Sequence, residues 1–417
     1  METRRNHSKK QASPAAHTPP SPASGTLAAP AKRAVAIYSD LLGAPTLAFL
    51  KAQAESLTRF TPIYVGSRGY GKRGIEFPAD RRIVINPSGS LLGKLREIPY
   101  KVFGYDPGFF RRVEASRPVL LHAHYGPAGL VALPLARRLN VPLLVTFHGS
   151  DVTVRDEYAR RASYTHRVYC RHKNLVVKEG SLFLCISQFI RNRLLQQGFP
   201  DERTILHYIG VDMQFFHPDG AASRRPVVLF VGSLREVKGC EYLIRAMGQL
   251  QELVPDVELV VIGDGPLRRP LQELARKLLR RCRFLGYQPQ AVIRDWMRQS
   301  KVFSVPSTEA ASGATEGLGL VFLEAQATGL PVTSFASGGI PEAVAHGETG
   351  LLAPERDWQQ LARDILQLLQ NEPLRLRMSE AGQKRVRNSF NLETQTRKLE
   401  QIYESVLSRY KQETERC

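Results

Sequence analysis

Residues 119–149 read VLLHAHYGPAGLVALPLARRLNVPLLVTFHG, and this stretch contains the pattern that decides the fold. Two apolar runs, VLLHAHY and PLLVTFHG, stand on either side of a helix-like segment. Strands that are apolar along their whole length and alternate with helices are typical of a parallel sheet covered on both faces. The stretch therefore predicts an α/β protein.

The same alternation continues on both sides of this stretch and is interrupted once. The further apolar runs are AVAIYS, TPIYVG, IVIN, LFLCIS and ILHYIG before the interruption, and VVLFVGS, VELVVIG, RFLG, KVFSVP and PVTSF after it. We therefore predict two Rossmann-like, doubly wound domains, 33–212 and 227–390, with a polar linker at 213–226. Residues 391–417 are predicted to form a helix that crosses back to the first domain. Because ligands of such sheets bind beyond the carboxyl ends of the strands, chemistry is expected where the two domains face each other.

Residues 1–32 form a basic stretch rich in proline, alanine and serine, which we predict to be a disordered tail. Prolines and polar residues interrupt the apolar run that a secretory signal needs, so export is not expected. No later run approaches the roughly 18 to 20 apolar residues of a membrane span. We predict a cytoplasmic protein whose membrane contact, if it has one, is peripheral.

The net positive charge of the chain indicates an anionic partner. The 417 residues include 58 Lys and Arg against 39 Asp and Glu, a formal net charge of +19. Nucleic acid, an anionic membrane surface and a phosphorylated substrate all fit such a surplus. Many of the basic residues lie among apolar and aromatic ones between positions 68 and 112, a pattern that suits lipid headgroups, stacked bases or a merely solvated face. Five scattered cysteines predict neither a disulfide framework nor a metal site.

The most informative segment for chemistry is PSTEAASGATEGLGLVFLEAQATGLPV, residues 306–332. Gly317 and Gly319 allow the backbone to approach a ligand, and a short helix is predicted to follow and to end at Gly329. A helix start beside such glycines can bind an anion. Glu316 and Glu324 lie on either side of this start and can accept hydrogen bonds from sugar hydroxyls. The alternative is that both carboxylates are simply solvated.

Cations follow another predicted strand, in FVGSLREVKG, residues 230–239. Arg235 and Lys238 precede a helix and could neutralise a diphosphate leaving group, although a solvated turn has the same composition. The turn IGDGPL at 262–267 lacks the third glycine of a dinucleotide-binding motif, and the chain has no phosphate loop of the GxxxxGK type. Dehydrogenase and P-loop functions are therefore disfavoured.

Histidines end two strands of the predicted first domain. His122 and His124 end one strand, and His148 ends another, followed by Gly149 and Asp151. A histidine in this position can bind a sugar hydroxyl or position a phosphate, and we favour such a role for His148 and a packing role for His122. Zinc is the alternative, but no HExxH motif is present. The chain has no Asp-x-Asp pair for a metal-bound diphosphate, so protein cations are expected to take that role and no metal or cofactor is predicted.

Together these segments resemble the retaining glycosyltransferases of the GT-B class that are called family four. The resemblance covers nearly everything after residue 33 and is most specific in EGLGLVFLEA, followed by GLPV and SGGIPEAV. FVGSLREVKG, IGDGPL, RFLG, TFHGSD and IGVD occur in the expected order, and the segment order is most similar to bacterial exopolysaccharide and colanic-acid-type transferases.

The resemblance implies that a sugar passes from a nucleotide donor, with UDP-sugars favoured, to a glycan or lipid-linked acceptor with retention of anomeric configuration. It implies that Glu316 binds the donor sugar, Glu324 the ribose, and Arg235 with Lys238 the diphosphate, while His148 closes over the sugar. Further donor contacts are implied for Gly232, Gly263, Gly286, Tyr287, Gly317, Leu318, Gly319 and Leu320. Gly43 and His124 are implied on the acceptor side.

Two positions depart from the family pattern. Ser233 follows Gly232 where many members have arginine, so Arg235 substitutes for that arginine or Lys238 carries the diphosphate. The double-glycine loop after the first strand is reduced to Gly43. Two other functions remain open at this point: a basic membrane- or nucleic-acid-binding protein on a degenerate scaffold, with nucleic acid the less favoured partner, and an epimerase or phosphorylase of the same architecture.

Overall fold

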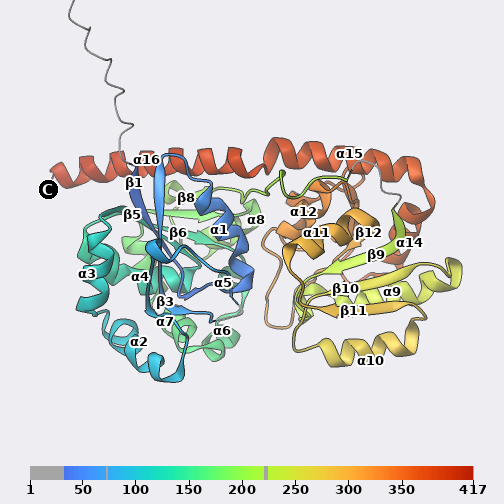
Figure 1. Cartoon of the computed structure of the whole chain (residues 1–417), viewed down its shortest axis with the longest axis horizontal. Helices are drawn as coiled ribbons and strands as arrows, with labels where there is room; N and C mark the ends of the chain where they lie inside the picture. Colours follow the sequence, from blue (N-terminus) through green and yellow to red (C-terminus); the bar gives the residue numbers. More distant parts are fainter. Residues whose placement is uncertain (1–31, 72–73, 220–223, 417) are drawn as a thin grey trace, which may run out of the picture. The chain divides into compact units, whose positions relative to one another are not determined.

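The computed structural model describes residues 32–71, 74–219 and 224–416. The tail predicted at 1–32 lies outside the described residues except for Lys32. From Arg33 onward the chain forms one compact unit that contains two separate parallel sheets (Figure 1).

The first sheet is built from eight strands of the described chain, and every pairing among them is parallel. Its order is β2-β3-β1-β5-β6-β7-β8, with β4 paired to β3. The strands are β1 (Arg33–Tyr38), β2 (Leu41–Leu42), β3 (Phe60–Gly69), β4 (Arg82–Asn86), β5 (Pro118–His124), β6 (Leu143–Phe147), β7 (Leu182–Cys185) and β8 (Thr204–Leu206). The helices between them are α1 (Ala48–Glu55), α2 (Leu91–Phe103), α3 (Pro107–Ala115), α4 (Gly126–Leu139), α5 (Ser150–Thr153), α6 (Asp156–Ala162), α7 (Tyr164–Glu179) and α8 (Gln188–Gln196).

The second sheet has the order β11-β10-β9-β12-β13-β14, again with parallel pairings. Its strands are β9 (Arg225–Val231), β10 (Glu258–Ile262), β11 (Cys282–Gly286), β12 (Ser300–Ser304), β13 (Val332–Phe335) and β14 (Gly350–Ala353). The helices of this half are α9 (Cys240–Leu253), α10 (Arg268–Leu278), α11 (Gln290–Gln299), α12 (Leu320–Ala327), α13 (Ile340–Ala343), α14 (Trp358–Gln370) and α15 (Glu372–Ser389). When the six strands are numbered 1 to 6 in sequence order, the sheet reads 3-2-1-4-5-6, which is the doubly wound arrangement. The chain reverses its direction across the sheet between strand 1, which is β9, and strand 4, which is β12.

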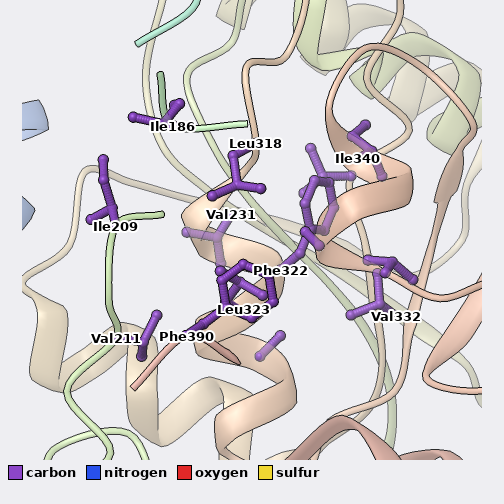
Figure 2. Packing of buried hydrophobic residues seen from close by; sticks show 14 of the residues in the cluster. Ile186, Ile209, Val211, Val231, Leu318, Phe322, Leu323, Val332, Ile340 and Phe390 are labelled. Atoms are coloured by element: carbon purple, nitrogen blue, oxygen red, sulfur yellow. The ribbon is translucent and has the colours of Figure 1, made fainter. Parts of the chain in front are cut away.

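One of the two hydrophobic clusters extends across both sheets. A single hydrophobic cluster contains Ile186 and Ile209, which follow strands of the first sheet, together with Leu318 and Phe322 of the second half. Figure 2 shows these side chains near one another, and all four are at most 5% exposed. Residues on either side of the predicted linker therefore contribute to the same buried volume.

The last helix, α16 (Leu392–Arg416), packs against the first sheet. Tyr403 places its ring 5.4 Å from that of Phe60, and its hydroxyl hydrogen-bonds His122 Nδ1 at 2.7 Å. The buried carboxylate of Glu400 accepts hydrogen bonds from the backbone amides of Thr58 and Arg59. Helix α16 thus completes the core of the first half, although the whole second sheet lies between them in the sequence.

The predicted fold class is confirmed, and each predicted apolar run overlaps a strand, although β8 includes only the first two residues of ILHYIG. Two strands are additional: β2 has only two residues, and β14 follows a turn that the sequence pattern did not distinguish. The predicted linker ends too late, because β9 begins at Arg225 and pairs there with Ser300. Among the described residues, no helix combines the length and apolarity needed to cross a membrane.

Candidate active site

The reversal point of the second sheet carries the predicted charged residues. Strands β9 and β12 are neighbours, and the loops after them hold Lys238 and Glu316. Lys238 Nζ donates a hydrogen bond to Glu316 Oε2, and the two side chains form an ion pair. The Ser307 hydroxyl donates to the same oxygen at 3.4 Å. Both charged side chains are mostly buried, so their interaction is weakly screened by solvent.

Three glycines line up at the ends of adjacent strands beside this pair. Gly232 and Gly263 directly follow β9 and β10, Gly286 is the last residue of β11, and the Gly263 amide donates to the Gly286 carbonyl at 2.8 Å. A Cβ atom at Gly263 would lie 1.9 Å from the Gly232 carbonyl oxygen, and the φ of Gly263 is +136°. Only glycine fits there, so the backbone itself forms this edge of the site.

Helix α12 starts directly after the Glu316 loop. Gly319 is its N-cap residue with φ +83°, Leu318 is buried before it, and Leu320 is the first helical residue. Glu324 lies one turn into the helix, and burial raises the pKa of its carboxyl to about 7. Close to neutral pH this group can therefore either donate or accept a hydrogen bond.

A row of three histidine rings forms the part contributed by the first sheet. His122 hydrogen-bonds Thr146 Oγ1 at 2.7 Å in addition to Tyr403, which agrees with the packing role predicted for it. His124 stacks on His122, and its Nδ1 lies 3.1 Å from His148 Nε2. Burial lowers the pKa of all three rings, that of His124 to about 3, so the row is neutral at physiological pH.

Asp151 fixes the backbone around His148. Its carboxylate accepts hydrogen bonds from the amides of His148 at 3.1 Å, Gly149 at 2.9 Å and Gly126 at 2.9 Å. Burial raises the pKa of this carboxyl, and the backbone amides act in the opposite direction. The carboxylate thereby positions the turn that carries His148.

The two halves touch at His148 and Gly317. A Cβ atom at Gly317 would lie 2.3 Å from the His148 carbonyl oxygen, and one at Gly149 would lie 3.3 Å from Gly317 Cα. Ser187 Oγ donates to the Gly317 carbonyl at 2.6 Å. The residues predicted from separate segments, His148 and Glu316 with Gly317, are therefore brought together by the fold.

Other predicted residues lie elsewhere. Arg235 is exposed and lines a pocket of about 400 Å³ with Glu241 and Arg356, and Lys238 does not line that pocket. Gly43 lines a different pocket of about 350 Å³, among residues of β3 and β4. Tyr287 follows Gly286 with 64% of its side chain exposed.

The sequence analysis missed several residues of the site. Ser187 and Ser307 come shortly after strand ends, a position that could have marked them as candidates. Phe49 and Tyr125 place their rings 5.0 Å and 4.5 Å from that of His148. No local pattern distinguishes Phe49 from an ordinary helix residue, since only the fold brings α1 to the end of β6.

Solved structures share this architecture. Sucrose-phosphate synthase from Thermosynechococcus elongatus matches 90% of this chain and 100% of its own with a TM-score of 0.72 at 22% identity. Anabaena Alr3699/HepE, solved in complex with UDP-glucose, matches 89% of this chain and 99% of its own with a TM-score of 0.68 at 20% identity. The protein therefore has the two-sheet GT-B fold of glycosyltransferases.

Sequence comparison narrows the class to a family. The families described as "Glycosyltransferase Family 4" and "Glycosyl transferases group 1" match residues 62–215 and 213–385. The amylovoran biosynthesis glycosyltransferase AmsK of Erwinia amylovora is 32% identical over 67% of this chain and 69% of its own. WcaL of Salmonella typhimurium, whose name assigns it to colanic acid biosynthesis, is 30% identical over 68% of this chain and 70% of its own. The chain therefore belongs to the family-four glycosyltransferases.

Proposed function

We propose that this glycosyltransferase moves a sugar from a UDP-sugar to a hydroxyl of a glycan or lipid-linked acceptor, with retention of anomeric configuration. The observation that carries the proposal is the Lys238–Glu316 pair at the reversal point of the second sheet, where the backbone of His148 from the other half contacts Gly317, the residue after Glu316. The cation of Lys238 can bind a phosphate, and the carboxylate of Glu316 can accept hydrogen bonds from sugar hydroxyls. The neutral imidazole of His148 can hydrogen-bond a further hydroxyl.

Each group has a proposed role. Lys238 binds the diphosphate and stabilises its charge as the bond to the sugar breaks, which is electrostatic catalysis by a preorganised cation. Glu316 accepts hydrogen bonds from hydroxyls of the donor sugar, and Glu324 contacts the ribose. Lys238 is held beside Glu316 whereas Arg235 is exposed, so the diphosphate is bound chiefly by Lys238.

The neutral histidine row suits the other side of the sugar. Because burial lowers the pKa of His148, its imidazole can hydrogen-bond a hydroxyl without adding a positive charge. We propose that a phosphate oxygen of the leaving group takes the acceptor proton on the same face of the sugar, so that no protein nucleophile and no metal takes part. The nuclear magnetic resonance spectrum of the product identifies its anomer, and inversion relative to the donor would overturn retention.

Alr3699/HepE, which shares this fold, was solved in complex with UDP and with UDP-glucose, and this supports the proposal of a UDP-sugar donor. The biosynthetic names of AmsK and WcaL support a glycan acceptor. We also propose an anionic membrane surface as a further partner, on the net charge of the chain, and a cytoplasmic location.

The decisive experiment measures donor binding and transfer with a matched pair of lysine variants. We expect UDP-sugars, in preference to GDP- and ADP-sugars, to raise the melting temperature, because a ligand that binds only the folded state stabilises it. Lys238→Ala is expected to weaken donor binding and turnover by about 10- to 100-fold, the loss of a charge-assisted hydrogen bond. Lys277→Ala, at an exposed lysine of α10, is the control and should match the wild type. If no nucleotide sugar binds, or if Lys238→Ala behaves as Lys277→Ala does, the proposal is wrong.

A further inference from the structure

Helix α2 exposes the residues that a surface helix normally buries. Its exposed side chains include Leu91 (77%), Leu92 (81%), Leu95 (64%) and Phe103 (76%). Gly93, Glu97 and Tyr100 are its buried residues. A helix of a globular protein usually turns its apolar stripe toward the core and its charged residues toward water. In α2 the arrangement is largely reversed.

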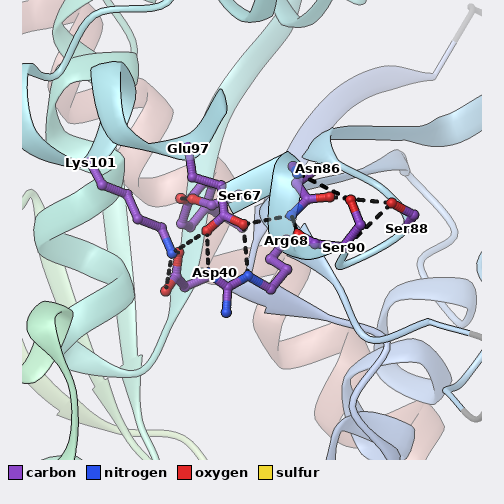
Figure 3. A network of polar contacts seen from close by, with 10 residues as sticks. Asp40, Ser67, Arg68, Asn86, Ser88, Ser90, Glu97 and Lys101 are labelled. Atoms are coloured by element: carbon purple, nitrogen blue, oxygen red, sulfur yellow. Dashed lines mark hydrogen bonds and ion pairs between the residues drawn. The ribbon is translucent and has the colours of Figure 1, made fainter. Parts of the chain in front are cut away.

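Polar contacts hold the inner face of α2 in place (Figure 3). The Glu97 carboxylate is 2% exposed and accepts two hydrogen bonds from Arg68, at 2.7 and 2.8 Å, and one from Asn86 at 2.8 Å. Lys101 lies 3.0 Å from both Glu97 and Asp40. Paired guanidinium–carboxylate bonds of this kind are strong and directional. The helix is therefore fixed to the sheet through charges, and its leucines are left free for another contact.

The basic residues of α2 border its apolar arc. At about 100° per residue, the exposed apolar residues from Ile98 round to Phe103 span an arc of about 140°. Exposed Lys94 lies beyond one edge of this arc and exposed Arg96 beyond the other. An apolar face with lysine and arginine along both borders is the pattern of helices that lie in the plane of a membrane interface.

The surroundings of α2 are also basic and partly apolar. In the neighbouring helix α3, Arg111 and Arg112 are exposed against one exposed carboxylate, that of Glu114. A pocket of about 230 Å³ opens beside the carboxyl end of α2, where Val102 and Phe103 face apolar residues of α4. Of the aromatic residues in the basic segment of the sequence, Tyr100, Phe109 and Phe110 are buried, so the exposed surface is narrower than the sequence suggested.

We propose that α2 is the membrane-docking element of this enzyme and lies flat on an anionic lipid bilayer. Leu91, Leu92, Leu95 and Phe103 enter the boundary of the acyl chains, while Lys94 and Arg96 reach the lipid phosphates. This proposal rests on the membrane partner named under the proposed function and assigns that partner to a surface. The residues of this surface are separate from the Lys238–Glu316 site, so an experiment can contradict membrane docking without contradicting sugar transfer, and the reverse.

The positive charge of α2 favours an anionic bilayer over two other possible binding partners of this helix face, a second copy of the chain and the stretch 1–32. Pairing α2 with its counterpart in a second copy of the chain would bring Lys94 and Arg96 of each copy close to those of the other, which is electrostatically unfavourable. The stretch 1–32 is itself basic, with a single leucine, and complements neither the charge nor the apolar arc. An anionic lipid surface complements both.

The test is cosedimentation of the full chain with vesicles of phosphatidylglycerol and phosphatidylcholine, compared with phosphatidylcholine alone. The test variant combines Leu91→Ser, Leu92→Ser, Leu95→Ser and Phe103→Ser. The matched control combines Leu253→Ser and Leu376→Ser, which are 59% and 56% exposed on α9 and α15. We expect the wild type and the control to bind anionic vesicles, and the α2 variant to bind at least about tenfold more weakly. Lys94→Gln with Arg96→Gln should weaken binding and reduce its dependence on salt.

Because every substituted residue is exposed, the α2 variant should keep the melting temperature and the UDP-sugar-induced thermal shift of the wild type, and these measurements separate docking from folding and from catalysis. The proposal is overturned if the wild type does not bind anionic vesicles, or if the α2 variant binds them as well as the control does. It is also overturned if the wild type forms a dimer that the α2 variant loses while neither binds lipid, because the occupant is then a second copy.

Discussion

At the scale of single residues, the site depends on groups whose protonation the fold has set. The histidine row is neutral because burial lowers the pKa of its three rings, and burial raises the pKa of the Glu324 carboxyl to about 7. Solvent-exposed carboxyls ionise far below this pH. The same side chain in an open loop would therefore offer the ligand only an acceptor, whereas here it can also donate.

The raised pKa of Glu324 predicts how stability depends on pH. The folded state holds this proton more tightly than the unfolded state, where the pKa is near 4.5. The carboxyl's contribution to stability is therefore complete at low pH and is lost as the pH rises through about 7. Replacing Glu324 by glutamine removes this dependence. Relative to the wild type, Glu324→Gln should gain about 1 to 3 kcal/mol in free energy of unfolding on going from about pH 5 to about pH 8.

Urea unfolding at the two pH values measures this difference. Glu348→Gln, at an exposed carboxyl in a turn, is a suitable control and should follow the wild type at both. Parallel curves for Glu324→Gln and the wild type would show that the Glu324 carboxyl is ionised well below neutral pH.

At the scale of elements, the amphipathic helices α16 and α2 have different roles because their apolar faces have different surroundings. Helix α16 buries Leu399, Tyr403 and Val406 against the first sheet, while α2 leaves its leucines in water and buries a glutamate. Helix α16 also uses a buried glutamate, Glu400, which binds the loop before β3 through both carboxylate oxygens.

Removing the Glu400 carboxylate should loosen α16. The side chain is 1% exposed and accepts hydrogen bonds from Thr58 N, Thr58 Oγ1 and Arg59 N at 2.6 to 2.8 Å. Glu400→Ala leaves these donors unsatisfied and is expected to lower the free energy of unfolding by about 2 to 4 kcal/mol. Glu404→Ala, one turn further along, removes a 35% exposed ion-pair partner of Arg33 and should cost less than about 1 kcal/mol. Equal losses in denaturant unfolding would contradict the anchoring role of Glu400.

At the scale of the whole molecule, the proposed site is formed where the two halves are in contact. The His148 turn and Gly317 are in backbone contact, and Ser187 of the first half hydrogen-bonds the Gly317 carbonyl. Glu342 of the second half accepts hydrogen bonds from the amides of Gln188 and Phe189, at the start of α8. These contacts set the separation of the histidine row from the Lys238–Glu316 pair.

A methyl group at Gly317 should disturb that separation. The added Cβ would lie 2.3 Å from the His148 carbonyl oxygen, so the two backbones must move apart. Because a misplacement of about 1 Å can cost about 100-fold in rate, we expect Gly317→Ala to lower turnover by about that factor. Gly248→Ala is the control, since its Cβ would lie 3.6 Å from Leu278 within the helical region of the same half. Turnover of Gly317→Ala equal to that of Gly248→Ala would show that this contact does not govern the chemistry.

The sequence by itself determined the fold class, the strands and the family. Fully apolar runs separated by helical segments can bury both faces only in a parallel sheet, and EGLGLVFLEA places Glu316 and Glu324 on either side of a helix start. The boundaries were less certain: β9 begins inside the predicted linker, and β2 and β14 are too short or too irregular for their pattern to stand out.

Only the tertiary structure decided which of the candidate residues meet. Lys238 and Arg235 are equivalent cations in FVGSLREVKG, yet one pairs with Glu316 and the other faces solvent. Likewise, the leucines of α2 have the composition of a buried stripe but are exposed, because Arg68, Asn86 and Asp40 come from distant strands and loops to hold Glu97 and Lys101. Local sequence fixes periodicity and residue chemistry, whereas contacts between residues far apart in the chain depend on strand order and sheet packing.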